Sequence, residues 1–179
     1  SSYLPPNGSW VNRFGERFTF DDLADALLQR PEGEGPCYGT HVLYALNYLI
    51  RIDEACAVLE PVTVARIRQR LQQASMNLEN AQYSTGAWSE DWHVPRGEAR
   101  SSLPEPPLAA KNIVRATGHH LEWIALANYD VRPSQACVTR ASSYLLRRGL
   151  SFAPSEIGES YGPLPHAARA LCLLHNQDW

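Results

Sequence analysis

The chain has 179 residues, of which 44% are hydrophobic and 20% are charged, and its formal net charge is −3. This length suits one domain with a sizeable core, and the composition is that of a globular protein rather than a disordered or fibrous one. The slightly acidic balance and the lack of a basic run exclude nucleic acid as the main partner, and no apolar stretch has the length of a membrane span.

Residues 1–179 are therefore interpreted as a single α-helical domain. The first residues, SSYLPPNGSW, have no feature of a signal peptide, and the only methionine is Met76. We expect the chain to be a fragment or the mature part of a longer chain, and its compartment stays open.

The first half of the chain predicts three helices. Thr19 and Asp22 form a near capping box at the start of residues 19–30, and proline and glycine residues end that helix. Residues 40–53 are apolar on nearly every side, which indicates a buried helix. Pro61 is well placed as the first residue of a helix over 61–82, whose arginines and glutamines mark a solvated face.

The second half predicts three more helices. Residues 82–107 are rich in Pro, Gly and Ser but also contain tryptophans, which favours an ordered loop. A fourth helix opens with Gly118, His119 and His120 and ends near Asn128. The fifth begins at Pro133 and is stopped by Gly149, and the sixth covers residues 165–177.

Three segments repeat a common pattern. GTHVLYALNYL at 39–49 and GHHLEWIALAN at 118–128 share a glycine, a histidine two residues later and an aromatic residue three further on; GPLPHAARALCLL at 162–174 is a looser copy. His120 thus matches His41, and Trp123 matches Tyr44. Recurrence of one supersecondary unit predicts a stacked or closed helical array.

The cysteines do not form a recognisable framework. Cys37, Cys56, Cys137 and Cys172 are widely spaced and contain no CxxC pair. Cys137 and Cys172 lie in apolar helical runs, where a buried free thiol is the commoner state. One or two long-range disulfides remain an alternative for an exported protein.

The segment after the third helix carries a family resemblance. Leu78, Gln82, Gly86 and Trp88 fit the second half of the QW motif, a leucine or aromatic residue, three residues, glutamine, a short spacer and then G-x-W. The chain in this respect resembles the superfamily of terpenoid cyclases and protein prenyltransferases. The segments WVNRFGERF, CYGTHVLYALNYLIRID, GAWSEDW and TGHHLEWIALA resemble bacterial, planctomycete-type members in particular.

The resemblance implies an all-α fold of antiparallel helical hairpins arranged as an α/α-toroid. A complete toroid needs about twelve helices, so this chain predicts a partial or half toroid. The resemblance carries over neither of the best-known activities. Residues 89–92 read SEDW where the cyclases have the acidic D-x-D-D motif, and Asp53 and Cys56 are spaced as D-x-x-C rather than as the D-x-C zinc pair of the prenyltransferases.

The repeated histidines are candidates for metal binding. If the copies are equivalent, His41 and His120 occupy the first turns of helices that face a central cavity. The positive end of the helix dipole keeps imidazole neutral, which is the form that binds metal or accepts a proton. Cys37, His41 and His120 therefore form a candidate zinc site. The favoured alternative is that both histidines cap helices or bond to neighbouring loops, because the spacing matches no known metal-ligand motif.

Other polar and aromatic residues are candidates for catalysis or ligand binding. The candidate catalytic residues are Asp91, His93, His119 and Glu122. The candidate cavity-lining residues are His41, Tyr44, Trp88, Trp92, His120, Trp123, Tyr161 and His166. For the tryptophans the alternative is structural packing. Glu156 and Glu159 are interpreted as part of a solvated loop.

Two functional hypotheses follow. The first is a non-catalytic helical-toroid module that binds an apolar or isoprenoid-like small molecule or a protein partner. The second is an enzyme of transferase, cyclase or lyase type that uses a histidine-lined central cavity; its cofactor stays open, and zinc is an option that the spacing of the ligands does not favour. The missing catalytic motifs favour the first hypothesis.

Overall fold

The computed structural model describes residues 8–94, 110–152, 158 and 161–176, and within them the chain is mostly helical. The α-helices are α1 Phe20–Leu28, α2 Thr40–Cys56, α3 Pro61–Ala81, α4 Ala110–Leu126, α5 Gln135–Ser151 and α7 Pro163–His175, with a 3-10 turn η3 at Tyr129–Val131. The six predicted helices are thus all present. None of the described helices combines the length and apolar character that a membrane span requires.

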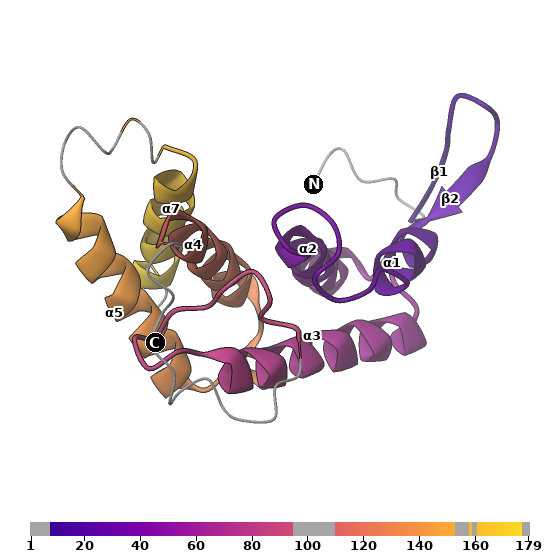
Figure 1. Cartoon of the computed structure of the whole chain (residues 1–179). Helices are drawn as coiled ribbons and strands as arrows, with labels where there is room; N and C mark the ends of the chain where they lie inside the picture. The colour runs from indigo at the N-terminus through magenta and orange to yellow at the C-terminus, as the bar shows by residue number, and fades with distance from the viewer. Residues whose placement is uncertain (1–7, 95–109, 153–157, 159–160, 177–179) are drawn as a thin grey trace.

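A small hairpin that the sequence did not predict precedes the helices. Strands β1 Ser9–Val11 and β2 Arg17–Thr19 are antiparallel, with Trp10 opposite Phe18. Because each strand has only three residues, neither is long enough to show an alternating hydrophobic pattern. The hairpin projects from the N-terminal end of α1 (Figure 1).

Local capping signals place the starts of two helices as predicted. Thr19 caps α1, accepting a hydrogen bond from the Asp22 backbone N–H while the Asp22 carboxylate accepts from the Thr19 backbone, which completes the capping box. Pro61 opens α3, where its missing N–H leaves no intrahelical bond unmade. With 21 residues, α3 is about 31 Å long and runs beneath α1 and α2 (Figure 1).

Two predicted boundaries in the second half were wrong. Helix α4 begins at Ala110, so His119 and His120 lie in its middle rather than in its first turn. Helix α5 begins at Gln135 and continues through Gly149 to Ser151. In both helices a glycine lies inside the helix and does not mark an end.

Gly118 is buried at the closest approach between α4 and α7. A Cβ built on Gly118 would lie 2.9 Å from the Ala167 nitrogen and 3.0 Å from the His166 carbonyl carbon, which are backbone atoms. The two helix backbones therefore meet where only glycine fits. This contact brings the start of α7 against the middle of α4.

We expect Gly118→Ala to lower the free energy of unfolding by about 1–3 kcal/mol, because the methyl group must push α7 away. The control is Gly149→Ala in α5, where a Cβ meets no atom of the described residues within 4 Å. Better helix propensity should make that variant more stable by up to about 1 kcal/mol. Chemical denaturation measures both changes. Equal stabilisation of the two variants would contradict the close packing at Gly118.

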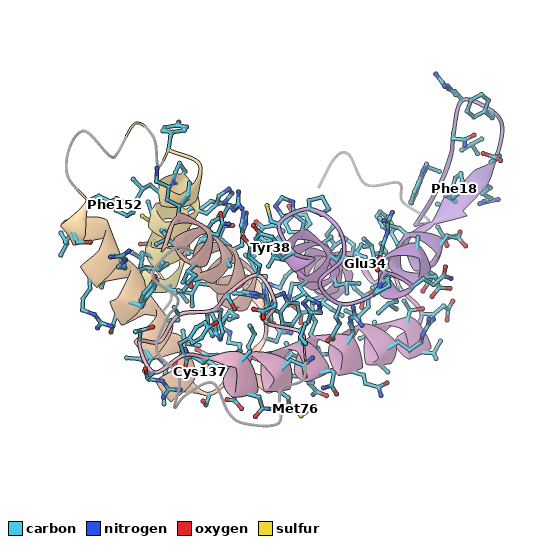
Figure 2. The ribbon with its side chains drawn as sticks, in the orientation of Figure 1. Phe18, Glu34, Tyr38, Met76, Cys137 and Phe152 are labelled. Carbon is cyan, nitrogen blue, oxygen red and sulfur yellow. The ribbon has the colours of Figure 1, made fainter. Side chains whose placement is uncertain are left out.

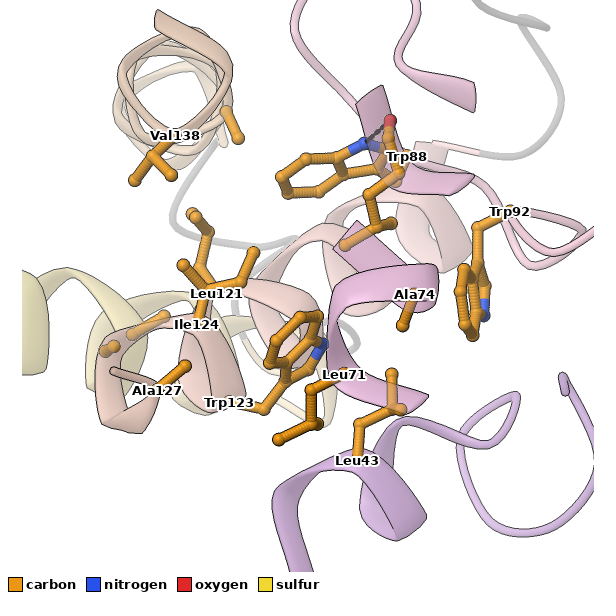
Figure 3. Packing of buried hydrophobic residues seen from close by; sticks show 14 of the residues in the cluster. Leu43, Leu71, Ala74, Trp88, Trp92, Leu121, Trp123, Ile124, Ala127 and Val138 are labelled. Atoms are coloured by element: carbon orange, nitrogen blue, oxygen red, sulfur yellow. Dashed lines mark hydrogen bonds between the residues drawn. The ribbon is translucent and has the colours of Figure 1, made fainter. Parts of the chain in front are cut away.

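The core is built around three tryptophans from two segments of the chain. Trp88, Trp92 and Trp123 are at most 1% exposed and pack among aliphatic side chains of α2, α3 and α4 (Figure 3). These positions assign the three tryptophans to structural packing, the alternative left open by the sequence. Each indole N–H has an acceptor; Trp88, for example, donates to the Leu78 carbonyl at 2.9 Å.

The residues of the QW-like segment join α3 to α4 and α5. The Gln82 side-chain amide donates to the Gly86 and Cys137 carbonyls at 3.0 and 2.9 Å, and its oxygen accepts from Arg140. The Trp88 backbone N–H donates to Thr117 Oγ1 at 3.0 Å. These bonds fix the segment after α3 against α4 and so orient the helix that carries the paired histidines.

Candidate metal centre

A cavity of about 170 Å³ lies between α2, α4 and α7. Each of its lining residues carries a polar group, and they come from helix positions far apart in sequence. The lining residues are Thr40, His41, Tyr44, His119, Glu122, His166 and Arg169. The predicted residues His41, Tyr44, His119, Glu122 and His166 thus share one cavity, although the sequence analysis assigned them to different roles.

Glu122 is buried in this cavity and contacts three of its other lining residues. Its carboxylate lies 3.1 Å from His119 Nδ1, 3.2 Å from His166 Nδ1 and 3.3 Å from Arg169 Nη1. His119 and Glu122 are three residues apart on α4 and so share one helix face, while His166 and Arg169 have the same spacing on α7. The helix contact at Gly118 brings these two pairs together.

The Glu122 carboxylate is ionised in this setting. Burial opposes ionisation, but hydrogen bonds from His119 and the nearby His166 outweigh it and hold the pKa of Glu122 below its ordinary value. An ionised carboxylate only accepts hydrogen bonds, so the donors to Glu122 are the Nδ1–H groups of His119 and His166. Each Nε2 then retains a lone pair when its ring is neutral.

His119 is the most informative residue of the cavity. Its side chain is 3% exposed, and its buried Nε2 has no hydrogen-bond partner among the residues that the structure describes. An imidazole lone pair buried without a partner is costly, because water no longer solvates it. A carboxylate on Nδ1 and a free lone pair on Nε2 are the arrangement found in histidines that bind zinc.

Cys37 and His41 complete a set of donors around His119. One ligand atom from each of Cys37, His41 and His119 lies within 4.8 Å of the others, and the same holds for His119, Glu122 and His166. The His41 and His119 rings are 5.2 Å apart, and those of His119 and His166 are 3.7 Å apart. His119 therefore belongs to both sets.

An unusual turn places Cys37 beside these histidines. Cys37, Tyr38 and Gly39 have φ angles of 51°, 62° and 77°, a left-handed run that is strained for the first two residues. Thr40 Oγ1 donates to the Cys37 carbonyl at 2.7 Å, and Trp92 Nε1 donates to the Tyr38 carbonyl at 3.0 Å. Tyr38 lies between α2 and α4 (Figure 2).

Side-chain bonds to Tyr38 anchor the same turn. Its hydroxyl donates to Glu90 at 2.5 Å and accepts from Arg115 of α4. The turn is therefore tied both to the segment after α3 and to α4. Such anchoring maintains the strained backbone that presents Cys37.

The pKa shifts of the other two donors, Cys37 and His41, favour the neutral form of each side chain in the absence of a cation. Burial raises the pKa of the Cys37 thiol, an effect that Glu122 reinforces and Arg115 opposes. Partial desolvation, with help from the nearby His119 and His166, lowers the pKa of His41 although the residue is exposed at the mouth of the cavity. Metal binding would displace the proton of a protonated thiol, so affinity should rise with pH.

His120 does not belong to this cavity, which corrects the predicted set of Cys37, His41 and His120. Its ring contacts Trp88 and Trp92, and its Nδ1 accepts a hydrogen bond from Trp123 Nε1 at 3.1 Å. Successive residues on a helix point about 100° apart, so His119 faces the cavity while His120 faces the core. Full burial lowers the pKa of His120 well below its ordinary value of 6.5.

This burial predicts acid sensitivity of the fold. The folded chain binds a proton at His120 less readily than the unfolded chain. The contribution of the neutral His120 to the free energy of unfolding is therefore complete above pH 6.5 and is lost as the pH falls below that value. In that range the free energy of unfolding should drop by about 1.4 kcal/mol per pH unit from this residue. His120→Gln keeps an acceptor for Trp123 and should remove that part of the slope.

Denaturation of the metal-free protein between pH 6.5 and 4.5 measures the slope. His175→Gln, a change at an exposed histidine of α7, is the control and should leave it unaltered. An unchanged slope in His120→Gln would contradict burial of a neutral imidazole.

The other predicted site residues lie elsewhere. Asp91 accepts a hydrogen bond from Ser89 Oγ, and the His93 ring packs against Gly33. Tyr161 is 74% exposed. Glu156 and Glu159 lie outside the described residues. All four cysteines are free thiols; Cys137 is buried as predicted, whereas Cys172 is exposed.

Comparison of the chain with models of protein families, with curated proteins and with solved structures gives no match. The chemistry of the site is therefore argued from its own geometry.

Sequence reasoning missed two cavity residues. Arg169 donates to the Tyr44 hydroxyl at 2.7 Å and pairs with Glu122, yet in the sequence it stands among apolar residues of the looser third copy of the repeat. Its one signal is its position three residues after His166. Thr40 is the first residue of the helix predicted over 40–53 and carries no other signal in the sequence.

Proposed function

We propose that this protein is a zinc enzyme that activates a water molecule for hydrolysis. The observation that carries the proposal is His119, whose buried and unpartnered Nε2 sits amid cysteine, histidine and carboxylate donors. Cys37, His41 and His119 would hold the metal. Three protein ligands and an open position facing a cavity are characteristic of catalytic rather than structural zinc.

The donor types favour zinc over other divalent ions. A thiolate with two imidazoles suits zinc, whereas magnesium and calcium prefer oxygen ligands. Glu122 is assigned to the outer shell, where it orients His119 through Nδ1. Bound zinc lowers the pKa of its water to about 7.

The same carboxylate prepares a general base. The Nδ1–H of His166 donates a hydrogen bond to Glu122 at 3.2 Å. The lone pair on Nε2 of the same ring is then available to accept a proton from water. Glu122 then stabilises the imidazolium ion that forms. The side chain of His166 is partly exposed and lines the cavity, so solvent reaches it.

The proposal is tested with the cobalt-substituted protein. Its visible spectrum should titrate with an apparent pKa near 7, and hydrolysis of 4-nitrophenyl acetate should rise with the same pKa and vanish on chelation. His166→Gln should retain the metal and lose most of the hydrolysis. A spectrum without any titration would indicate a closed, structural site and contradict the proposal.

A second candidate is the non-catalytic module with a partial α/α-toroid fold. It is supported by the bonds of Gln82 and Trp88 between helices and by a cavity of about 520 Å³ between α5 and α7. That volume is typical of small-molecule sites, and its apolar wall includes Val138, Leu146 and Leu171. Saturable binding of farnesol, abolished by Val138→Trp and unaffected by chelation, would support this candidate; no binding would contradict it.

A further inference from the structure

Arg169 forms the outer wall of the cavity. It lies one helical turn after His166 on α7, and its side chain is 54% exposed. The guanidinium group therefore faces both the buried Glu122 and the solvent. A ligand that enters this cavity meets Arg169.

The Arg169 guanidinium group has more N–H donors than its contacts with Glu122 and Tyr44 use. One N–H donates to Glu122 and one to the Tyr44 hydroxyl, and its other three N–H groups have no protein acceptor among the residues that the structure describes. A guanidinium fork matches the two oxygens of a carboxylate, with which it forms short, charge-assisted hydrogen bonds. The Tyr44 hydroxyl adds a further donor, because it accepts from Arg169 and retains its own proton.

Charge and size restrict the ligand. With a divalent cation beside the Cys37 thiolate, the Glu122 carboxylate and the Arg169 guanidinium, a single positive charge is left over. That balance suits a monoanion, which neutralises the site, whereas a doubly charged phosphate would leave an excess negative charge beside the buried Glu122. The cavity of about 170 Å³ has the volume of roughly six water molecules, which fits a small molecule.

We propose that Arg169 and Tyr44 bind the carboxylate group of a small substrate, next to the metal held by Cys37, His41 and His119. The proposal rests on the proposed function, which supplies the cation. It gives Arg169 the role of a specificity residue. The competing role is a structural tie of α7 to α2 through Tyr44.

Titrations with acetate, inorganic phosphate and acetamide distinguish these roles. Backbone amide signals of residues 166–170 are followed by NMR in the zinc-loaded and zinc-free protein. Acetate should bind saturably and more tightly than phosphate, and neutral acetamide should not bind. Arg169→Gln should weaken acetate binding roughly 10-fold or more, since charge-assisted hydrogen bonds are lost.

Arg66→Gln is the matched control. Arg66 on α3 has a similar exposed fraction and pairs with Asp25, so its replacement makes the same change in net charge away from the cavity. It should leave acetate binding unaltered. Arg169→Lys keeps the charge without the fork and should bind with intermediate strength.

The outcomes separate this inference from the proposed function. If zinc does not bind, the proposed function fails, while acetate should still bind the zinc-free protein more weakly and in an Arg169-dependent manner. Equal acetate affinity in the native protein and in Arg169→Gln would overturn the inference even when zinc is bound. Absence of saturable acetate binding, or tighter binding of phosphate, would overturn it as well.

Discussion

His119→Ala should weaken zinc binding by more than about 100-fold. Loss of an outer-shell partner alone lowers zinc affinity 10–100-fold, and His119 is assigned as a direct ligand at the centre of both donor sets. Glu122→Gln should show the smaller, outer-shell effect. Competition with a chromophoric chelator measures both affinities, and circular dichroism checks that each variant is folded.

The neighbouring histidine provides the sharpest control. His120→Gln changes the same residue type one position along α4, but its ring lies in the tryptophan core. Its zinc affinity should equal that of the native protein. If His120→Gln lost zinc while His119→Ala retained it, the assignment of the metal ligand would be wrong.

Trp88→Ala should lower the free energy of unfolding by about 3–5 kcal/mol, the usual range for removing a buried tryptophan. Trp88 is fully buried, and its indole and backbone N–H groups bond to Leu78 and Thr117 of different helices. For a chain of this length the loss corresponds to a drop in melting temperature of roughly 6–20 °C. Calorimetry measures it.

Two variants calibrate that effect. Trp88→Phe keeps most of the buried area and loses the indole hydrogen bond, so the cost should be smaller, about 1–3 kcal/mol. Trp10→Ala removes a tryptophan that is 37% exposed on the hairpin and should cost about 1 kcal/mol or less. Similar losses in Trp10→Ala and Trp88→Ala would contradict the central role of Trp88 in joining the helices.

Features encoded in a few neighbouring residues were predictable. The Thr19–Asp22 capping box and Pro61 fix helix starts by local bonding and by the missing proline N–H, and the sequence predicts both. The start of α4 was not predictable in this way. Gly118 looked like a helix start, and only its contact with the backbone of α7 explains a glycine in the helix interior.

In the candidate site too, contacts between neighbouring residues were predictable and contacts between distant segments were not. His119 and Glu122 are three residues apart on one helix, so the sequence predicts that they are neighbours, and both are among its candidate catalytic residues. Their association with Cys37 depends on a left-handed turn, and that with His166 depends on the packing of α4 against α7. The repeat pattern matched His120 to His41 and so selected the wrong member of the histidine pair.

X-ray absorption at the zinc edge of the reconstituted protein tests the metal assignment most directly. The assignment predicts one zinc per chain with one sulfur ligand at about 2.3 Å, from Cys37, and nitrogen ligands at about 2.0–2.1 Å, from His41 and His119. A protein that retains no zinc, or a zinc shell of nitrogen and oxygen without sulfur, would contradict it.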